Sequence, residues 1–376
     1  MDSLDWANLP VNLLDLVLEK LSSPSDYLRF SDVCMLWNSV AKDNISKRTA
    51  PMLLTYTGKA ETWSLCDIIE DTVIMQLELP NKRFCGFSKG WLITMDANFV
   101  VTLINPFSRI KGRKAKENSI IALSALKLPK TFEQRTRWAK QCDHYIFKAT
   151  ISADPISNAE DCIVVVIYEE SCQLAFIRLE KDTRWTYIDI QCRQIEEVVY
   201  VEDTFYAIDY LNKLFSFQVT AHEFNSDEDV ILVAEGFKPG DICKRYLVEL
   251  SENELLMVQR YFDYKDRRRV TTKFEVFKVD DYNCEWTKIN SLGDVALFVG
   301  ENSSISVLAS KNLGCLPQNC IYFLHDWDRH AIDFGHGGGD FGVYNIKNKS
   351  LLPIDTTHAA TLLKMSDQTA IWAFRS

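Results

Sequence analysis

The sequence predicts a small all-α segment at the N-terminus followed by a large all-β domain. Within the first 50 of the 376 residues, apolar side chains recur every three or four positions, which is the spacing of amphipathic helices. From Met52 onward the pattern changes to short runs rich in β-branched and aromatic residues, and turn residues separate these runs. A hydrophobic fraction of 47% with only 14 Gly and 10 Pro is typical of a packed globular protein and excludes a disordered chain.

The N-terminal segment is expected to form two or three short helices. Apolar residues recur at helical spacing over residues 9–21, and Pro10 stands where the start of a helix tolerates proline. After a break, Ser25 or Asp26 can cap a second helix, and the helical spacing continues as far as Ala41. The sequence therefore predicts consecutive amphipathic helices within this short segment.

The all-β region is long enough for a β-propeller. Many short strands without intervening helical patterns form a sandwich, a barrel or a propeller. The region is longer than a sandwich or small barrel needs, and blades of about 40 to 50 residues would give about six to seven blades. We therefore expect a helical domain over residues 1–48 and a propeller over residues 49–376.

The two ends of the all-β region are expected to pair with each other. A ring of blades closes without an exposed edge only if an N-terminal strand joins the last blade. Residues 52–57 and 370–374 are the natural candidates for that pairing. Three stretches, 176–189, 277–290 and 344–355, each contain a short charged turn between two strands. We interpret them as a recurring blade unit, with three unrelated hairpins as the alternative.

Charge and cysteine content argue against several classes of protein. The 42 Lys and Arg against 52 Asp and Glu give a net charge of −10, which disfavours general nucleic-acid binding. No apolar run approaches the roughly 20 residues that span a bilayer, and the N-terminus lacks the pattern of a secretory signal. The 11 cysteines form no C-x-x-C pair, so most are interpreted as small buried side chains rather than zinc ligands or redox groups. A nuclear or cytoplasmic location is expected, or both.

The N-terminal segment resembles an F-box. The resemblance rests on apolar residues in a fixed order, namely Leu9-Pro10, Leu13-Leu14, Leu18, Leu21, Val33-Cys34 and Trp37. In that family the helices bind the Skp-type adaptor of a cullin-RING ubiquitin ligase. Carried over to this chain, the resemblance implies adaptor-binding roles for Leu9, Pro10, Leu13, Leu14, Leu18, Val33 and Trp37.

Physical reasoning supports a partner for these helices. Three short helices cannot bury all of their apolar faces on each other, so another surface is expected to cover them. The alternative is that the helices pack only against the β domain of the same chain.

The remainder of the chain resembles the KIB-type β-propeller of plant F-box proteins. The blocks that carry this resemblance are residues 85–92, 103–108, 321–323, 340–344 and 371–374. The resemblance implies a substrate-recognition subunit of an SCF-type ubiquitin ligase. Such a subunit binds a Skp-type adaptor, and through it a cullin, and presents a protein substrate on the propeller. It performs no chemistry itself and needs no cofactor or metal. The alternative is a non-catalytic propeller that blocks a partner protein's binding surface.

A serine hydrolase is a remote alternative. Ser88 lies in a G-x-S-x-G pattern at 86–90, and residues 336–339 resemble the oxyanion-hole glycines of some esterases. However, a nucleophile elbow requires a helix after the serine, and residues 91–95 are predicted to form a strand. The tripeptide at 340–342 matches a kinase motif, but none of the other kinase motifs accompanies it.

The histidines and the charged clusters are interpreted as surface features. His325 and His330 flank two aspartates, Asp326 among them, that we expect to be solvated or turn-forming rather than metal ligands. The basic stretches at 109–116 and 265–269 are expected to be solvated loops, and docking of an acidic substrate segment is the alternative. The acidic stretch from Glu223 to Asp229 is likewise expected to be a loop.

Overall fold

The structure is a computed structural model of the 376-residue chain. It describes residues 6–21, 24–45, 51–56, 62–68, 71–78, 83–109, 119–127, 146–169, 171–190, 194–220, 224–237, 243–250, 254–265, 268–280, 283–309, 316–326, 340–352 and 370–374.

The N-terminal residues form a helical module, by which we mean residues 6–45. It contains a 3₁₀ turn η1 (Trp6–Asn8) and the helices α1 (Val11–Lys20), α2 (Pro24–Ser31) and α3 (Met35–Ile45). Pro10 precedes α1, and its carbonyl oxygen accepts hydrogen bonds from the N–H groups of Leu13 and Leu14 at 2.9 and 3.1 Å. The expected helices are therefore present. The expected cap at Ser25 or Asp26 is wrong, because α2 already begins at Pro24, a residue suited to the first turn of a helix.

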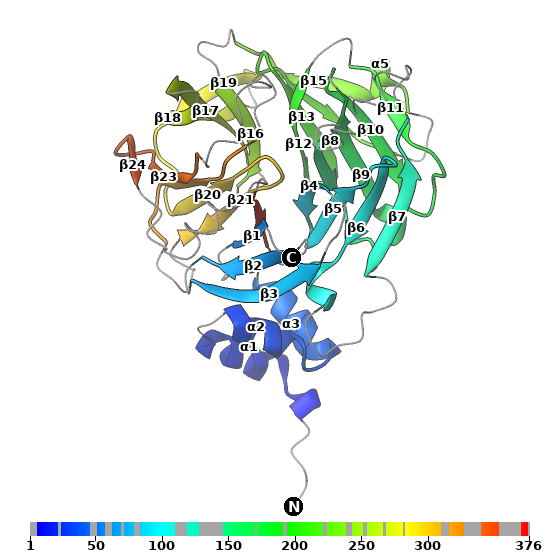
Figure 1. The fold of residues 1–376 in the computed structure, drawn as a ribbon, viewed down its shortest axis with the longest axis vertical. Coiled ribbons are helices and arrows are strands. Elements are labelled where there is room, and N and C mark those ends of the chain that lie inside the picture. The colour runs from blue at the N-terminus through cyan, green and yellow to red at the C-terminus, as the bar shows by residue number, and fades with distance from the viewer. Residues whose placement is uncertain are drawn as a thin grey trace, which may run out of the picture.

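The rest of the chain forms a six-bladed β-propeller, each blade being one antiparallel or mixed sheet (Figure 1). The structure therefore has six blades, which lies within the predicted range of six to seven. Blade 1 contains β25 (Ile371–Ala373), β1 (Met52–Tyr56), β2 (Thr62–Asp67) and β3 (Thr72–Glu78). Blade 2 contains β4 (Arg83–Ser88), β5 (Trp91–Met95), β6 (Val100–Ile104) and β7 (Ile120–Ala125), with a 3₁₀ turn η2 (Pro106–Arg109) between the last two.

The middle blades repeat this four-strand arrangement. Blade 3 contains β8 (Ile146–Ile151), β9 (Ile163–Tyr168), β10 (Gln173–Arg178) and β11 (Thr186–Ile188), with a 3₁₀ turn η4 (Ala159–Asp161) before β9. Blade 4 contains β12 (Ile195–Val201), β13 (Thr204–Asp209), β14 (Leu214–Phe217) and β15 (Val230–Ala234). Blade 5 contains β16 (Cys243–Glu249), β17 (Leu255–Lys265), β18 (Arg268–Asp280) and β19 (Glu285–Ile289).

Blade 6 departs from this arrangement. Its five strands lie in the order β21 (Ser304–Leu308), β20 (Val295–Val299), β22 (Cys320–Phe323), β23 (Gly342–Asn345) and β24 (Ser350–Leu352). The strand β20 pairs antiparallel with β21 on one side and parallel with β22 on the other. After β20 the next strand in the sequence, β21, lies on the inner side of β20. The later strands β22, β23 and β24 then follow on the outer side of β20.

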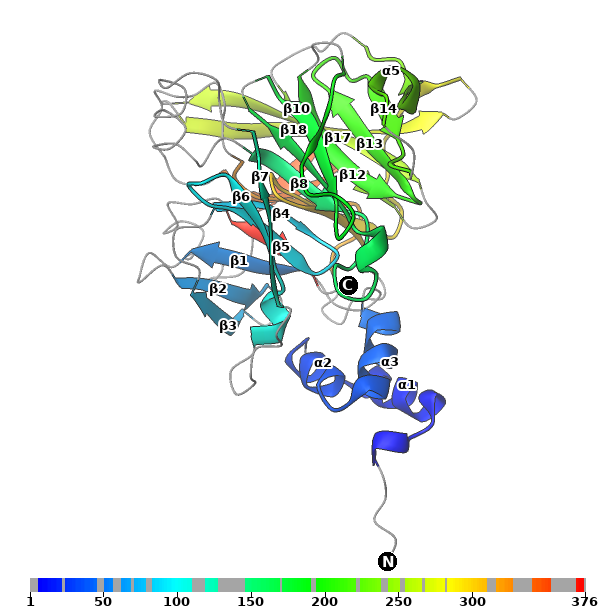
Figure 2. The same ribbon diagram turned by 90° about the vertical axis from the view of Figure 1, so that its right-hand side faces the viewer.

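The ring closes between the two ends of the all-β region, as predicted. β1 pairs antiparallel with β25, with Met52 opposite Ala373, Leu53 opposite Trp372 and Leu54 opposite Ile371. Trp372 is buried, and its indole N–H donates to the carbonyl oxygen of Val299 in blade 6 at 3.1 Å. The helical module precedes β1 directly and lies outside the ring (Figure 2).

Two of the inner hairpins show why the chain can turn so tightly. Lys89 and Gly90, which join β4 to β5, have φ angles of 49° and 78°. Glu202 and Asp203, which join β12 to β13, have φ angles of 42° and 59°. Two consecutive positive φ angles are the requirement of a type I′ hairpin turn, whose twist matches that of the flanking strands.

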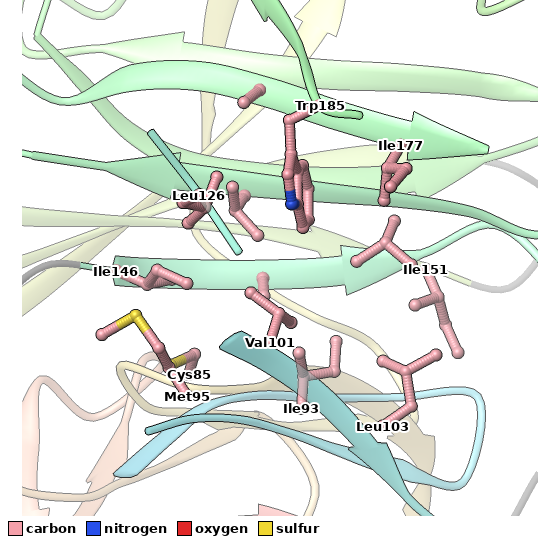
Figure 3. Packing of buried hydrophobic residues seen from close by; sticks show 14 of the residues in the cluster. Cys85, Ile93, Met95, Val101, Leu103, Leu126, Ile146, Ile151, Ile177 and Trp185 are labelled. Carbon is pink, nitrogen blue, oxygen red and sulfur yellow. The ribbon is translucent and has the colours of Figure 1, made fainter. Parts of the chain in front are cut away.

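The propeller core consists of apolar clusters between neighbouring blades. Figure 3 shows one of them, in which Ile93 and Val101 of blade 2 face Ile146 and Ile151 of blade 3. Trp185 belongs to the same cluster, and its indole N–H donates to the carbonyl oxygen of Ser124 at 2.7 Å. Each such side chain contributes about 1.5 to 3 kcal/mol when it is fully removed from water. Contacts between blades rather than within them therefore hold the ring together.

The recurring unit predicted from the sequence corresponds to an outer hairpin of three blades. The stretch 176–189 contains the β10–β11 pair, 277–290 contains the β18–β19 pair, and 344–355 contains the β23–β24 pair. The expected loop at 223–229 is wrong in part, because Ser226–Asp229 form the short helix α5.

Candidate functional site

The helical module has a small apolar core of its own. The buried members are Leu14, Leu18, Phe30, Trp37, Val40 and Ala41. The Trp37 and Phe30 rings lie 4.5 Å apart between centroids. The Trp37 indole N–H donates to the carbonyl oxygen of Trp6 at 2.9 Å, which attaches η1 to α3. The helices therefore pack on each other, contrary to the alternative in which they pack only against the β domain.

A second apolar face of α1 points away from that core. Leu13, Leu16 and Val17 have exposed fractions of 42%, 53% and 37%. Their spacing of i, i+3 and i+4 places them on one side of the helix, whereas Leu14 and Leu18 lie on another side and are buried. A helix that is apolar on two faces is suited to two apolar neighbours. The first neighbour is the core of the module, and the second face is open.

Exposed apolar side chains are concentrated in this module. In the part of the chain that the structure describes, 17 large apolar side chains are exposed, and seven of them lie between residues 6 and 35: Trp6, Val11, Leu13, Leu16, Val17, Val33 and Met35. Met35, at the start of α3, is 91% exposed. A concentration of exposed apolar side chains is typical of an interaction surface.

The seven residues implied by the resemblance fall into two groups. Leu14, Leu18 and Trp37 are buried in the core of the module, and Leu9 is half-buried against it. Pro10, Leu13 and Val33 are exposed. The sequence reasoning did not single out Leu16, Val17 or Met35 as surface residues. The i+3 and i+4 spacing from Leu13 is the signal that could have identified Leu16 and Val17.

The propeller contains an ion-pair network between blades 5 and 6, centred on the fully buried Arg260 and Asp326. The Arg260 guanidinium, on β17, donates to the carboxylates of Asp326 and Asp340 at 2.8 and 2.9 Å. It also donates to the carbonyl oxygens of Leu324 and Asp340 at 2.6 and 2.8 Å. The Tyr246 hydroxyl donates to Asp326. Arg260 therefore joins β17 to the segment that follows β22 and to Asp340, which lies two residues before β23.

This network corrects two expectations. Asp326 is not solvated but fully buried, and Arg269 is not a solvated loop residue but donates to the carbonyl oxygen of Asp326 at 2.6 Å. Burial opposes the charge on Asp326, but Arg260, Lys244 and Arg269 hold its pKa below the ordinary value. Burial lowers the pKa of His325 to about 4, and the neighbouring Arg269 adds to this effect. The imidazole is therefore neutral at pH 7.

A second buried ion pair joins blades 3 and 4. The Lys148 ammonium lies 3.0 Å from the Glu197 carboxylate, and both side chains are buried. Burial raises the pKa of Glu197, although Lys148 opposes that shift. A buried pair of this kind is weak support for stability but makes the loss of either partner costly. We interpret both buried networks as connections between blades.

Ser88 lies in a hairpin rather than in a nucleophile elbow. It is the last residue of β4, and the strand β5 follows after two turn residues, as predicted. Its hydroxyl lies 3.2 Å from the Thr150 hydroxyl and accepts from the Ile151 N–H at 3.3 Å. The stretch at 336–339 lies outside the described residues. Asp340 of the kinase-like tripeptide is a partner of Arg260.

Other expected features are seen only in part. Five of the eight cysteines that the structure describes are buried, and Cys284 is exposed. Within the described ranges, no three His, Cys, Asp or Glu side chains form a group suited to a metal ion, and no helix is long and apolar enough to cross a membrane. Most of the basic stretch at 109–116 lies outside the described residues.

The fold defines a class: a six-bladed β-propeller protein with a small helical module before the first blade. Comparison with known families agrees with this class. The family described as F-box-like matches residues 6–48, and the family described as KIB1-4 beta-propeller matches residues 65–345. The chain belongs to the KIB1-4 β-propeller family and carries an F-box-like domain.

Relatives from Arabidopsis thaliana are consistent with that assignment. The relative At5g55150 of Arabidopsis thaliana, an F-box protein by name, is 26% identical over 94% of each chain. The F-box protein At2g26160 of the same plant is 24% identical over 88% of this chain and 99% of its own. Among solved structures, the Cps50 (Swd1) β-propeller domain of Myceliophteria thermophila covers 82% of this chain and 87% of its own at 10% identity, with a TM-score of 0.40.

Proposed function

We propose that this chain is the substrate-recognition subunit of an SCF-type ubiquitin ligase. In this proposal the helical module binds a Skp-type adaptor and the propeller binds a protein substrate. The observation that carries the proposal is the apolar face of Leu13, Leu16 and Val17 on a module whose core is already filled by other residues. The F-box-like match over residues 6–48 supports the assignment of that face to the adaptor.

The mechanism is positional rather than chemical. Covering the α1 face removes exposed apolar area from water, and each large apolar side chain buried there contributes about 1.5 to 3 kcal/mol. The closed propeller then holds the substrate at a fixed place relative to the adaptor. This raises the effective concentration of substrate lysines near the ubiquitin-carrying enzyme. The chain itself acts as a non-catalytic receptor in the nucleus, the cytoplasm or both.

Co-purification with a Skp-type adaptor tests this proposal. We expect the double variant Leu13→Asp/Leu16→Asp to lose adaptor binding by about 100-fold or more, because two charges would be placed in the apolar centre of the interface. Both side chains are exposed in the free chain, so the variant is expected to fold. Val73→Asp, at an exposed position of β3, is the matched control and should bind the adaptor normally.

Two outcomes would refute the proposal. One is a folded native chain that does not bind the adaptor. The other is equal adaptor binding by the native chain and by Leu13→Asp/Leu16→Asp, because the α1 face would then not be the contact surface. Circular dichroism of each variant confirms that the helices and strands are retained.

A further inference from the structure

The outer edge of blade 4 is unusual among the blade edges. β15 is the last strand of that blade and consists of five uncharged apolar residues, Val-Ile-Leu-Val-Ala. Ile231 is 61% exposed and Leu232 is 41% exposed. Exposed apolar edge strands pair readily with other strands, and proteins usually protect them with charges, short length or a covering segment.

The other blades show such protection. The edge strand β19 carries the exposed charges Glu285 and Lys288. The edge strand β7 is covered by blade 3, because the Ser124 hydroxyl donates to the carbonyl oxygen of Thr183 at 2.7 Å and Trp185 donates to Ser124. β11 and β24 have only three residues each, and β3 ends on the exposed Glu78. β15, by contrast, carries no charged residue within its five positions, and the nearest charges lie in the residues that flank it.

The backbone of β15 is available for pairing on its outer side. Its register partners lie in β14 alone, from Val230 opposite Phe217 to Ala234 opposite Leu214. Among the described residues, none hydrogen-bonds to the backbone of Val230–Ala234 from the outer side. β15 and α5 lie at the rim of the propeller (Figure 1). Just after β15, the Glu235 N–H donates to the carbonyl oxygen of Cys284 in blade 5 at 3.2 Å.

The charges at both ends of β15 indicate which kind of strand fits. The helix α5, with the sequence Ser-Asp-Glu-Asp, precedes β15 directly, and Glu235 follows it. Glu228 is exposed, and Glu235 is 63% exposed although it pairs with Lys213. Acidic groups at both ends favour a strand with basic ends. They disfavour a second copy of this chain, because antiparallel pairing would place Glu235 of each copy beside the acidic α5 of the other.

We propose that the outer edge of β15 binds an extended segment of a partner protein by strand addition. The segment has branched apolar residues at its centre and Lys or Arg at its ends. Backbone hydrogen bonds to β15 supply affinity, and contacts with Ile231 and Leu232 select the apolar centre. This inference rests on the proposed function in one respect, since it takes the segment to belong to the ligase substrate.

A defined peptide tests the inference on the full-length chain. The probe is a fluorescein-labelled peptide, Lys-Arg-Thr-Val-Thr-Val-Thr-Val-Arg-Lys, and its matched control has Glu at the four basic positions. By fluorescence anisotropy we expect the basic peptide to bind about tenfold or more tightly than the acidic one, with a difference that shrinks as salt is added. We expect Ile231→Lys to weaken binding of the basic peptide by about tenfold or more, because an edge lysine blocks strand pairing. Leu351→Lys, on the exposed face of the short edge strand β24, is the matched control and should not change binding.

Three outcomes would overturn the inference. The first is that the two peptides bind equally or do not bind. The second is that Ile231→Lys binds the basic peptide as the native chain does. The third is a concentration-dependent dimer that Ile231→Lys abolishes, which would make a second copy the occupant. Adaptor co-purification of the same proteins keeps the two proposals separate, because Ile231→Lys should bind the adaptor normally whatever the peptide does.

Discussion

The helical module and the propeller bury their apolar residues to different extents. The module has one core cluster with six buried members and leaves a second apolar face of α1 open. The propeller places apolar clusters between its blades and closes the ring by pairing its first and last strands. The difference indicates that the propeller closes on itself, whereas the module leaves apolar surface exposed for the adaptor proposed above. Variants in each region test this difference.

The largest effect is expected where the propeller buries charge. Arg260→Met should lower the free energy of unfolding by about 3 to 5 kcal/mol, because the buried Asp326 would lose its nearest cationic partner. Urea unfolding followed by tryptophan fluorescence measures the change. Lys278→Met is the control, since its pair with Glu254 is exposed and should be worth less than about 1 kcal/mol. Equal effects of the two variants would contradict the interpretation of Arg260 as a connection between blades.

Lowering the pH from 6.5 to 4 is expected to reduce the free energy of unfolding by about 3 kcal/mol through His325 in the propeller. The pKa of His325 is about 4 in the folded chain and 6.5 ordinarily. Between these values the unfolded chain binds a proton that the folded chain does not. The stabilisation is therefore fully present above pH 6.5 and is lost as the pH falls toward 4, by about 1.4 kcal/mol for each pKa unit.

Urea unfolding at several pH values tests the role of His325. The variant His325→Asn keeps an acceptor for the Asp340 N–H, which His325 Nδ1 accepts at 3.4 Å, but does not titrate in this range. We expect its stability to vary less between pH 6.5 and 4 than that of the native chain. The same slope in both proteins would show that other groups, not His325, cause the pH dependence.

A smaller effect on stability is expected in the helical module. Two alanine variants of α1 distinguish its buried face from its exposed face. Leu14→Ala should destabilise the module by about 2 to 3 kcal/mol, because Leu14 is fully buried in its core. Leu16→Ala should change stability by less than about 0.5 kcal/mol but weaken adaptor binding. Helix content by circular dichroism and adaptor affinity measure the two properties. A large loss of stability with Leu16→Ala would mean that its face belongs to the core of the chain.

The sequence predicted features that depend on local pattern. Helical spacing located α1 and α3, and the demand for a closed ring identified Met52 and Trp372 as members of the pairing strands. The same spacing could not tell which apolar residues of α1 face inward, because Leu13, Leu14, Leu16 and Leu18 are equally apolar in the sequence.

Features that depend on contacts distant in sequence were not predictable. Asp326 stands next to a histidine in a polar stretch, which is typical of a turn, and only the fold brings Arg260 to it from 66 residues away. The parallel pairing of β20 with β22 was also missed, since a strand pattern indicates which face is buried but not which neighbour a strand takes.

The pairing of β1 with β25 also determines which part of the chain can finish folding first during synthesis. Leu53 is made 319 residues before its partner Trp372, since 372 − 53 = 319. At about 5 to 20 residues per second, roughly 15 to 65 s separate the two. During that interval the helical module is already outside the ribosome while the ring cannot close. The nascent chain can therefore expose the apolar α1 face before it has a finished propeller, and early binding of the proposed adaptor would shield that face from aggregation.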